Sequence, residues 1–144
     1  ADLVLASPGG HPKDIDLYQS QKAMEQATRV VQPGGNVLLV TQCGEGSGSE
    51  RFEAWMEHAY TADDVIHRIR ERFVIGGHKA YQIARETQRA NLHVYSEIPP
   101  GRVRAWLMTP VRSLTEINRL IAQSRSVLVL PQATLARARV TASP

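Results

Sequence analysis

The amino-acid sequence predicts an α/β domain: a three-layer, Rossmann-like fold with a mainly parallel four-stranded sheet flanked by helices. Short apolar runs without polar alternation recur along the chain, as is typical of strands that are buried on both faces. Segments with helical periodicity separate these runs, so crossovers should join successive strands and set them parallel. The chain has 144 residues, 42% of them hydrophobic, which is enough to bury a core of its own.

The N-terminal part predicts a strand, a helix and a second strand. Residues 2–6 are apolar and run into a Ser-Pro-Gly-Gly turn. Residues 14–31 carry apolar side chains at helical spacing. We expect Asp14 and Asp16 in the first turn of this helix, where the helix dipole favours acidic side chains. A Pro-Gly-Gly stop ends the helix, and the apolar run at 37–40 predicts the second strand.

The middle of the chain predicts three helices. A glycine-rich loop at 42–49 leads to a short helix with an aromatic side. Thr61, followed by two acidic residues, indicates the capped start of a helix that runs to about Phe73. The pair Gly76-Gly77 should break this helix, and a further helix is expected over 78–89.

The C-terminal part predicts two more strands and one well-marked helix. Residues 92–95 form the third strand candidate, and a helical turn is expected over 102–108. Ser113, with a glutamate three residues later, indicates a capping box at the start of a helix that ends near Gln123. The fourth strand is expected at 127–130. The apolar side chains of this last helix are expected to face the core: Leu114, Ile117, Leu120 and Ile121.

The predicted domain covers residues 1–134. Residues 135–144 show no partner within the chain, and we expect them to form a tail that returns toward a missing N-terminal domain. The chain starts at Ala1 rather than Met and enters a strand almost at once. We therefore expect it to be a piece of a longer protein.

Composition excludes several classes of protein. No apolar run approaches the roughly 20 residues that cross a bilayer, and no basic stretch precedes an apolar one as in a secretory signal, so a cytoplasmic location is expected. The single cysteine, Cys43, excludes an internal disulfide framework and a cysteine-based zinc site. The net charge of +3 is spread along the chain, so nucleic-acid binding is not expected. An interaction domain that uses the basic late helices stays an alternative.

The first glycine-rich loop is a candidate anion site. Residues 7–14 leave a strand and open onto a helix N-terminus, where backbone N–H groups and the helix dipole suit an anion. Gly9 and Gly10 are therefore candidates for cofactor binding. The loop contains neither a Gly-x-Gly-x-x-Gly nor a Walker pattern, and a tight turn that lets strand and helix pack together explains the glycines equally well.

The helix that follows carries a candidate carboxylate grip. Tyr18, Gln19 and Lys22 are three and four residues apart and can share one side of the helix. Together they offer an ammonium charge and two oriented donors. The alternative is an ordinary solvated face. The five histidines show no metal-binding spacing, and Cys43 is either a reactive thiol or, more simply, a packed side chain.

Three stretches together resemble the C-terminal domain of the nickel-pincer lactate racemase family. The first, residues 7–22, reads Ser-Pro-Gly-Gly-His-Pro-Lys-Asp-Ile-Asp-Leu-Tyr-Gln-Ser-Gln-Lys. The second is the Pro-Gly-Gly at 33–35, followed by a strand and the Cys-x-Glu-Gly loop at 43–46. The third is Gly-Gly-His-Lys-Ala-Tyr at 76–81. These stretches cover most of the first 85 residues in the family's order, and the later part is compatible but less specific.

The resemblance implies a two-domain enzyme that isomerises the chirality centre of a 2-hydroxy acid in the cleft between its domains. The implied cofactor is a nickel-pincer pyridinium nucleotide, tethered to a lysine of the N-terminal domain. In the family, the substrate's α-hydride moves to this cofactor while a histidine takes the hydroxyl proton. The tethering, nickel-binding and proton-transferring residues belong to the N-terminal domain and match no position here. No catalytic or metal-binding residue is therefore expected in this chain.

The resemblance also implies which residues bind substrate. The family's Tyr-Gln-x-x-Lys stretch maps onto Tyr18, Gln19 and Lys22, where the lysine neutralises the substrate carboxylate. The aromatic residue after Gly-Gly-His-Lys-Ala maps onto Tyr81, and some relatives carry Trp there. The expected function is thus substrate clamping in partnership with an N-terminal catalytic domain. The alternative is a stand-alone Rossmann-like module that binds a nucleotide or phosphate at residues 7–14.

Overall fold

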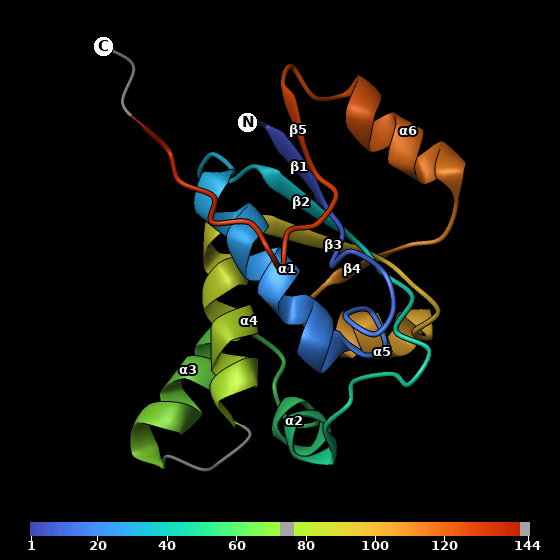
Figure 1. Ribbon diagram of the computed structural model, residues 1–144. Helices are drawn as coiled ribbons and strands as arrows, with labels where there is room; N and C mark the ends of the chain where they lie inside the picture. Colours follow the sequence, from blue (N-terminus) through green and yellow to red (C-terminus); the bar gives the residue numbers. More distant parts are fainter. Residues whose placement is uncertain (73–76, 142–144) are drawn as a thin grey trace.

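The computed structural model describes residues 1–72 and 77–141. Within these ranges, five strands form one wholly parallel sheet in the order β4-β3-β2-β1-β5 (Figure 1). The predicted α/β class is therefore confirmed. The strands are β1 (Leu3–Ala6), β2 (Asn36–Val40), β3 (Asn91–Tyr95), β4 (Thr109–Val111) and β5 (Val127–Leu130).

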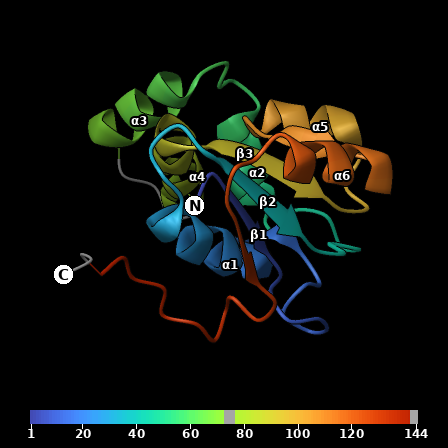
Figure 2. The same ribbon diagram turned by 90° about the horizontal axis from the view of Figure 1, so that it is seen from above.

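Helices connect the successive strands and cover both faces of the sheet. Figure 2, seen from above, shows α1 close to the sheet and α3 on the far side of α4. The helices are α1 (Leu17–Val30), α2 (Glu50–Met56), α3 (Ala62–Glu71), α4 (Gly77–Arg89), α5 (Pro100–Ala105) and α6 (Leu114–Ala122).

Alternate side chains of the strands divide the interior into two cores. The larger core lies between the sheet and the helices α1, α2, α4 and α5, and the smaller one lies under α6 on the opposite face. The strand residues Val4, Ala6, Val37, Leu39, Leu92 and Val94 face the larger core, and Leu3, Leu5, Leu38 and Val111 face the smaller one. Strands buried on both faces explain why the sequence shows apolar runs instead of alternation.

The sheet has one strand more than the four that the sequence predicts. The additional strand, β4, has three residues and includes Pro110, which lacks a backbone N–H group. Proline is tolerated there because β4 lies at the edge of the sheet, where one side of the strand has no neighbour to bond. A three-residue strand with a central proline has no apolar run by which it could have been recognised.

The start of α1 differs from the prediction. Asp16 is the N-cap of α1, and its side chain accepts a hydrogen bond from the Gln19 backbone N–H. Asp14 lies before the helix, where its carbonyl accepts a hydrogen bond from Cys43 N. Neither aspartate is therefore in the first helical turn, because α1 begins at Leu17, after the Asp16 cap.

The outer helix α6 is less buried than its pattern predicts. Ile117 and Leu120 pack against the smaller core as expected. Leu114 and Ile121, however, are 69% and 38% exposed. The smaller core contains few buried residues, so it covers only part of the apolar face of α6. The edge strand β5 is also largely exposed.

The expected end of a helix at Phe73 and the break at Gly76 lie outside the described residues. After β5 the chain turns back: Ala133 N donates to Ser7 O at 2.9 Å, and Ala138 N donates to Gln26 Oε1 of α1 at 3.2 Å. The role of residues 135–144 toward another domain stays a prediction.

Candidate functional site

The loop between β2 and α2 caps the N-terminus of α1. Leu17 N donates to Gly46 O at 2.9 Å, and Tyr18 N donates to Ser47 O at 3.0 Å. Gln19 N donates to Asp16 Oδ1 at 2.7 Å. The first backbone donors of α1 are therefore all bonded within the protein, which satisfies groups that a helix end otherwise leaves open.

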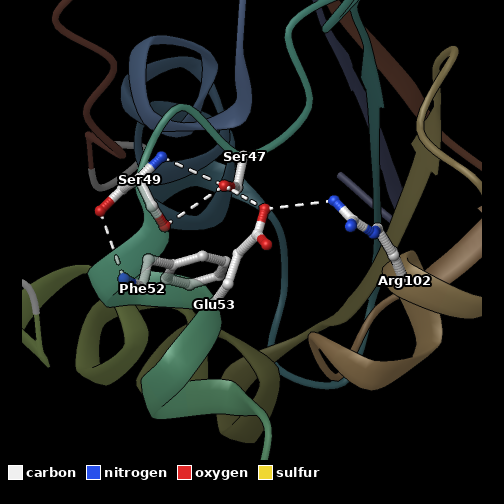
Figure 3. A network of polar contacts seen from close by, with 5 residues as sticks. All are labelled: Ser47, Ser49, Phe52, Glu53 and Arg102. Atoms are coloured by element: carbon white, nitrogen blue, oxygen red, sulfur yellow. Dashed lines mark hydrogen bonds and ion pairs between the residues drawn. The ribbon is translucent and has the colours of Figure 1, made fainter.

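A polar network holds this capping loop in place (Figure 3). Ser47 Oγ donates to Glu53 Oε1 at 2.6 Å, and Arg102 Nη1 of α5 donates to the same oxygen at 3.3 Å. Ser49 is the N-cap of α2 and accepts a hydrogen bond from Phe52 N at 3.2 Å. The network thus links α2 and α5 to the start of α1, where the candidate grip begins.

The capping bonds count against the alternative of a phosphate site at residues 7–14. A phosphate at a helix N-terminus needs free N–H groups, and those of α1 are taken. Gly9 and Gly10 both have positive φ, 104° and 79°, as a tight turn requires. A Cβ at Gly9 would meet Gln132 Cγ at 3.4 Å, so Gly9 faces the segment after β5. A cofactor role for these glycines stays a prediction.

The three grip residues lie on the first turns of α1 and reach the surface. Tyr18 is 36% exposed, and both Gln19 and Lys22 are exposed. The N-cap at Asp16 fixes where the helix begins and therefore which way these three side chains point. All three residues are helical, so their spacing places the three side chains on one side of α1, as predicted.

The N-terminal turn of α4 packs against Tyr18. The rings of Tyr18 and His78 meet edge to face with their centroids 6.4 Å apart. Lys79 Nζ lies 4.6 Å from the centroid of the Tyr18 ring. Gln21 Nε2 donates to Lys79 O at 3.1 Å and fastens the two helices together. Tyr18 is thus held between an aromatic ring and an ammonium group.

Two lysines concentrate positive charge at this point. Burial lowers the pKa of the half-buried Lys79, and the charge of Lys22 lowers it further, whereas nearby carboxylates raise it. In the part of the chain that the structure describes, neither lysine forms an ion pair with a carboxylate. The surface around Tyr18 is therefore suited to a small anion.

Tyr81 lies one turn further along α4 than His78. It is half-buried and lines a cavity between α1 and α4 together with His78. Because His78 also touches Tyr18, one histidine borders both aromatic residues. The sequence pattern predicts a helix that starts at His78 and indicates no separate role for His78 or Lys79. Both residues belong to the Gly-Gly-His-Lys-Ala-Tyr motif at 76–81, which could have indicated that they lie near the site.

The remaining candidates are structural. Cys43 is 1% exposed, with its Sγ 3.4 Å from Thr41 Oγ1 and 3.6 Å from Ser20 Oγ. Burial raises the pKa of the Cys43 thiol, which keeps it protonated and poorly nucleophilic. His93 bonds Asn36 Oδ1 at 3.0 Å, and burial lowers its pKa. Residues 1–72 and 77–141 contain no group of three or more His, Cys, Asp or Glu side chains that could hold a metal ion.

Fold and site together define an α/β domain whose first helix presents an exposed tyrosine, glutamine and lysine beside the start of a second helix. The model of the lactate racemase C-terminal domain matches residues 1–117. The chain therefore belongs to the lactate racemase C-terminal domain family.

Individual relatives agree with this assignment. The chain is 35% identical over 72 residues to a lactate racemase of Thermoanaerobacterium thermosaccharolyticum. The aligned residues cover 50% of this chain and 17% of that protein. It is 33% identical over 51 residues to a lactate racemase of Lactiplantibacillus plantarum, covering 35% of this chain and 12% of that protein.

A solved structure resembles the whole fold. The lactate racemase apoprotein from Thermoanaerobacterium thermosaccharolyticum superposes with a TM-score of 0.85 at 25% identity. The match covers 93% of this chain and 34% of that one, so this chain spans about a third of its relative's length. No helix in the described ranges has the length and apolar character that crossing a membrane requires.

Proposed function

We propose that this chain is the substrate-clamping C-terminal domain of a racemase or epimerase that acts on 2-hydroxy acids. Membership of the lactate racemase C-terminal domain family supports a racemase-associated role. The observation that carries the proposal is the exposed Lys22 ammonium group, which lies near Lys79 with no carboxylate paired to it in the described residues. Such a charge is available to the carboxylate of a small substrate.

In this proposal each residue has a distinct role. Lys22 forms an ion pair with the substrate carboxylate, and the side chains of Tyr18 and Gln19 donate hydrogen bonds that fix its orientation. Lys79 holds the Tyr18 ring and adds positive charge. Tyr81 forms a wall beside the substrate. Catalysis needs a partner, the N-terminal domain of the same protein, and this chain alone does not catalyse.

The cofactor of the proposed enzyme is a nickel-pincer nucleotide bound mainly by that other domain. The described residues of this chain offer no metal-ligand set, so they do not fit nickel by themselves. No step of the reaction is therefore assigned to nickel on this chain. Its part is to bind the carboxylate and hold the acid in one orientation. A cytoplasmic location stays a prediction.

Replacement of Lys22 tests the proposal. In the complete cofactor-loaded protein that contains this chain, Lys22→Ala should raise KM for lactate by about tenfold or more, because a hydrogen bond to a charged group contributes roughly 1.5–3 kcal/mol. Steady-state kinetics in both directions measures the effect. Lys22→Arg should recover part of the loss, since it keeps the charge.

Arg70→Ala is the matched control, because Arg70 is an exposed cation on α3, away from the grip. It should leave KM unchanged. Equal kinetics for Lys22→Ala and the unmodified protein would remove Lys22 from the site.

A further inference from the structure

A cavity of about 410 Å³ lies between α1 and α4, further along α1 than Tyr18. This volume is within the range of small-molecule sites, roughly 300–1,000 Å³. A three-carbon hydroxy acid would fill only part of it. The lining comes from Glu25, Thr28, Arg29, His78, Tyr81, Gln82, Arg85, Glu86 and Arg89.

The lining is rich in arginine, and not all of that charge is compensated. Arg29 pairs with Glu25 at 2.5 Å across one turn of α1. Arg89 donates to the Arg29 carbonyl at 3.4 Å, and the Arg85 guanidinium lies 5.8 Å from the centroid of the Tyr81 ring. Within the described residues, Arg85 and Arg89 form no ion pair. The cavity therefore carries free positive charge along α4.

One buried carboxyl group in this lining has no partner. Glu86 is 8% exposed, and its Oε2 atom makes no hydrogen bond among the described residues. Burial and the nearby Glu25 carboxylate raise the pKa of Glu86 to about 8, although Lys79 lowers it. At neutral pH Glu86 is thus mostly protonated and is a hydrogen-bond donor rather than a charge.

We propose that this cavity is a binding site for a small organic acid, next to the proposed substrate site and sharing Tyr81 with it, in which Arg85 pairs with the ligand carboxylate and Glu86 donates a hydrogen bond to that carboxylate. The terminal torsion of a glutamate is broad, so a rotation brings either carboxyl oxygen toward the cavity. A ligand acceptor in the cavity would give the protonated carboxyl group of Glu86 a hydrogen-bond partner through the oxygen that faces the cavity. With Glu86 neutral, three arginines face one carboxylate, which favours an anion over a cation.

Binding of succinate to the 144-residue chain tests the site directly. Backbone amide shifts, followed by NMR at constant ionic strength, should change saturably and mainly on α1 and α4. Arg85→Ala should weaken binding by about tenfold or more, as expected for loss of a charged hydrogen bond. Arg119→Ala, which removes an exposed arginine of α6, should leave the affinity unchanged.

The pH dependence of succinate affinity distinguishes the titration of Glu86 from the effect of the charged and titratable groups around it. These groups are Glu25, Arg29, His78, Lys79, Arg85 and Arg89. Between about pH 7 and pH 9.5 the unmodified chain should lose affinity, because Glu86 becomes a carboxylate and repels the ligand. Glu86→Gln keeps a neutral donor and should bind with little change over the same interval. Shifts that never saturate, shifts scattered over the surface, or equal affinity in Arg85→Ala would overturn the site. The measurement needs neither the partner domain nor the proposed racemase activity.

Discussion

At the scale of single residues, Gly77 shows how a contact overrides helix propensity. Gly77 is the first residue of α4, and a Cβ placed there would lie 2.6 Å from Cε2 of the Trp55 indole. Real side chains do not approach so closely, and the buried indole cannot move without displacing the core around it. The glycine is therefore required by the approach of Trp55 and not by backbone conformation.

We predict that Gly77→Ala destabilises the fold although alanine is the better helix former. Overpacking a core typically costs about 1–3 kcal/mol, which exceeds the propensity gain of at most about 1 kcal/mol. Urea unfolding measures the change in the free energy of unfolding. Gly101→Ala on α5 is the control, because a Cβ there meets nothing within 4 Å and should be neutral or stabilising. Equal effects of the two substitutions would contradict the steric explanation.

At the scale of elements, the start of α1 decides the geometry of the candidate site. Asp16 caps the helix, and the carbonyls of Gly46 and Ser47 bond the next two N–H groups. The helix therefore begins at a defined residue, and Tyr18, Gln19 and Lys22 follow at fixed angles around its axis.

We predict that Asp16→Ala costs about 1 kcal/mol of stability, as is typical for loss of an N-cap. It should also loosen Tyr18 against His78, which the chemical shifts of the Tyr18 ring protons in NMR spectra would record. Ser113→Ala removes the N-cap of α6, with a similar effect on stability but none on the Tyr18 signal. An unchanged Tyr18 signal in Asp16→Ala would mean that α4 alone positions the ring.

At the scale of the whole molecule, one buried acid should impose a pH dependence on folding. Burial raises the pKa of Glu86 to about 8 in the folded state. The unfolded chain releases this proton near the ordinary glutamate value of about 4.3. Between these two values the folded state holds more protons, so stability falls as pH rises and then levels off above about 8.

We predict that Glu86→Gln removes this slope. The variant should gain stability relative to the unmodified chain as pH rises from about 4.5 to about 9, by an amount on the order of a few kcal/mol. Thermal unfolding at both pH values measures the difference. Because every other titrating group is shared by the two proteins, the difference isolates Glu86. A constant difference across this range would show that Glu86 titrates normally in the fold.

Much of the architecture could be predicted from local patterns. Unbroken apolar runs predict strands that are covered on both faces, and β1 and β2 were found this way. The strands β3 and β5 were also found from their apolar residues, although His93 interrupts the first and the second is largely exposed. The capping residues of α3 and α6 were also recognisable, because Thr61 and Ser113 need only neighbours three residues away. The strand β4 was missed because its edge position, which tolerates Pro110, exists only in the assembled sheet.

Local sequence patterns specify the layered class of the fold and the face of α1 that carries Tyr18, Gln19 and Lys22. These properties depend on the spacing of residues within one segment. Contacts between distant segments place His78 and Lys79 beside Tyr18, leave half of the apolar side chains of α6 exposed, and bury Glu86 beside arginines. Periodicity shows which side of a helix is apolar, but the identity of its neighbour depends on the order of the strands and on contacts between segments far apart in the chain.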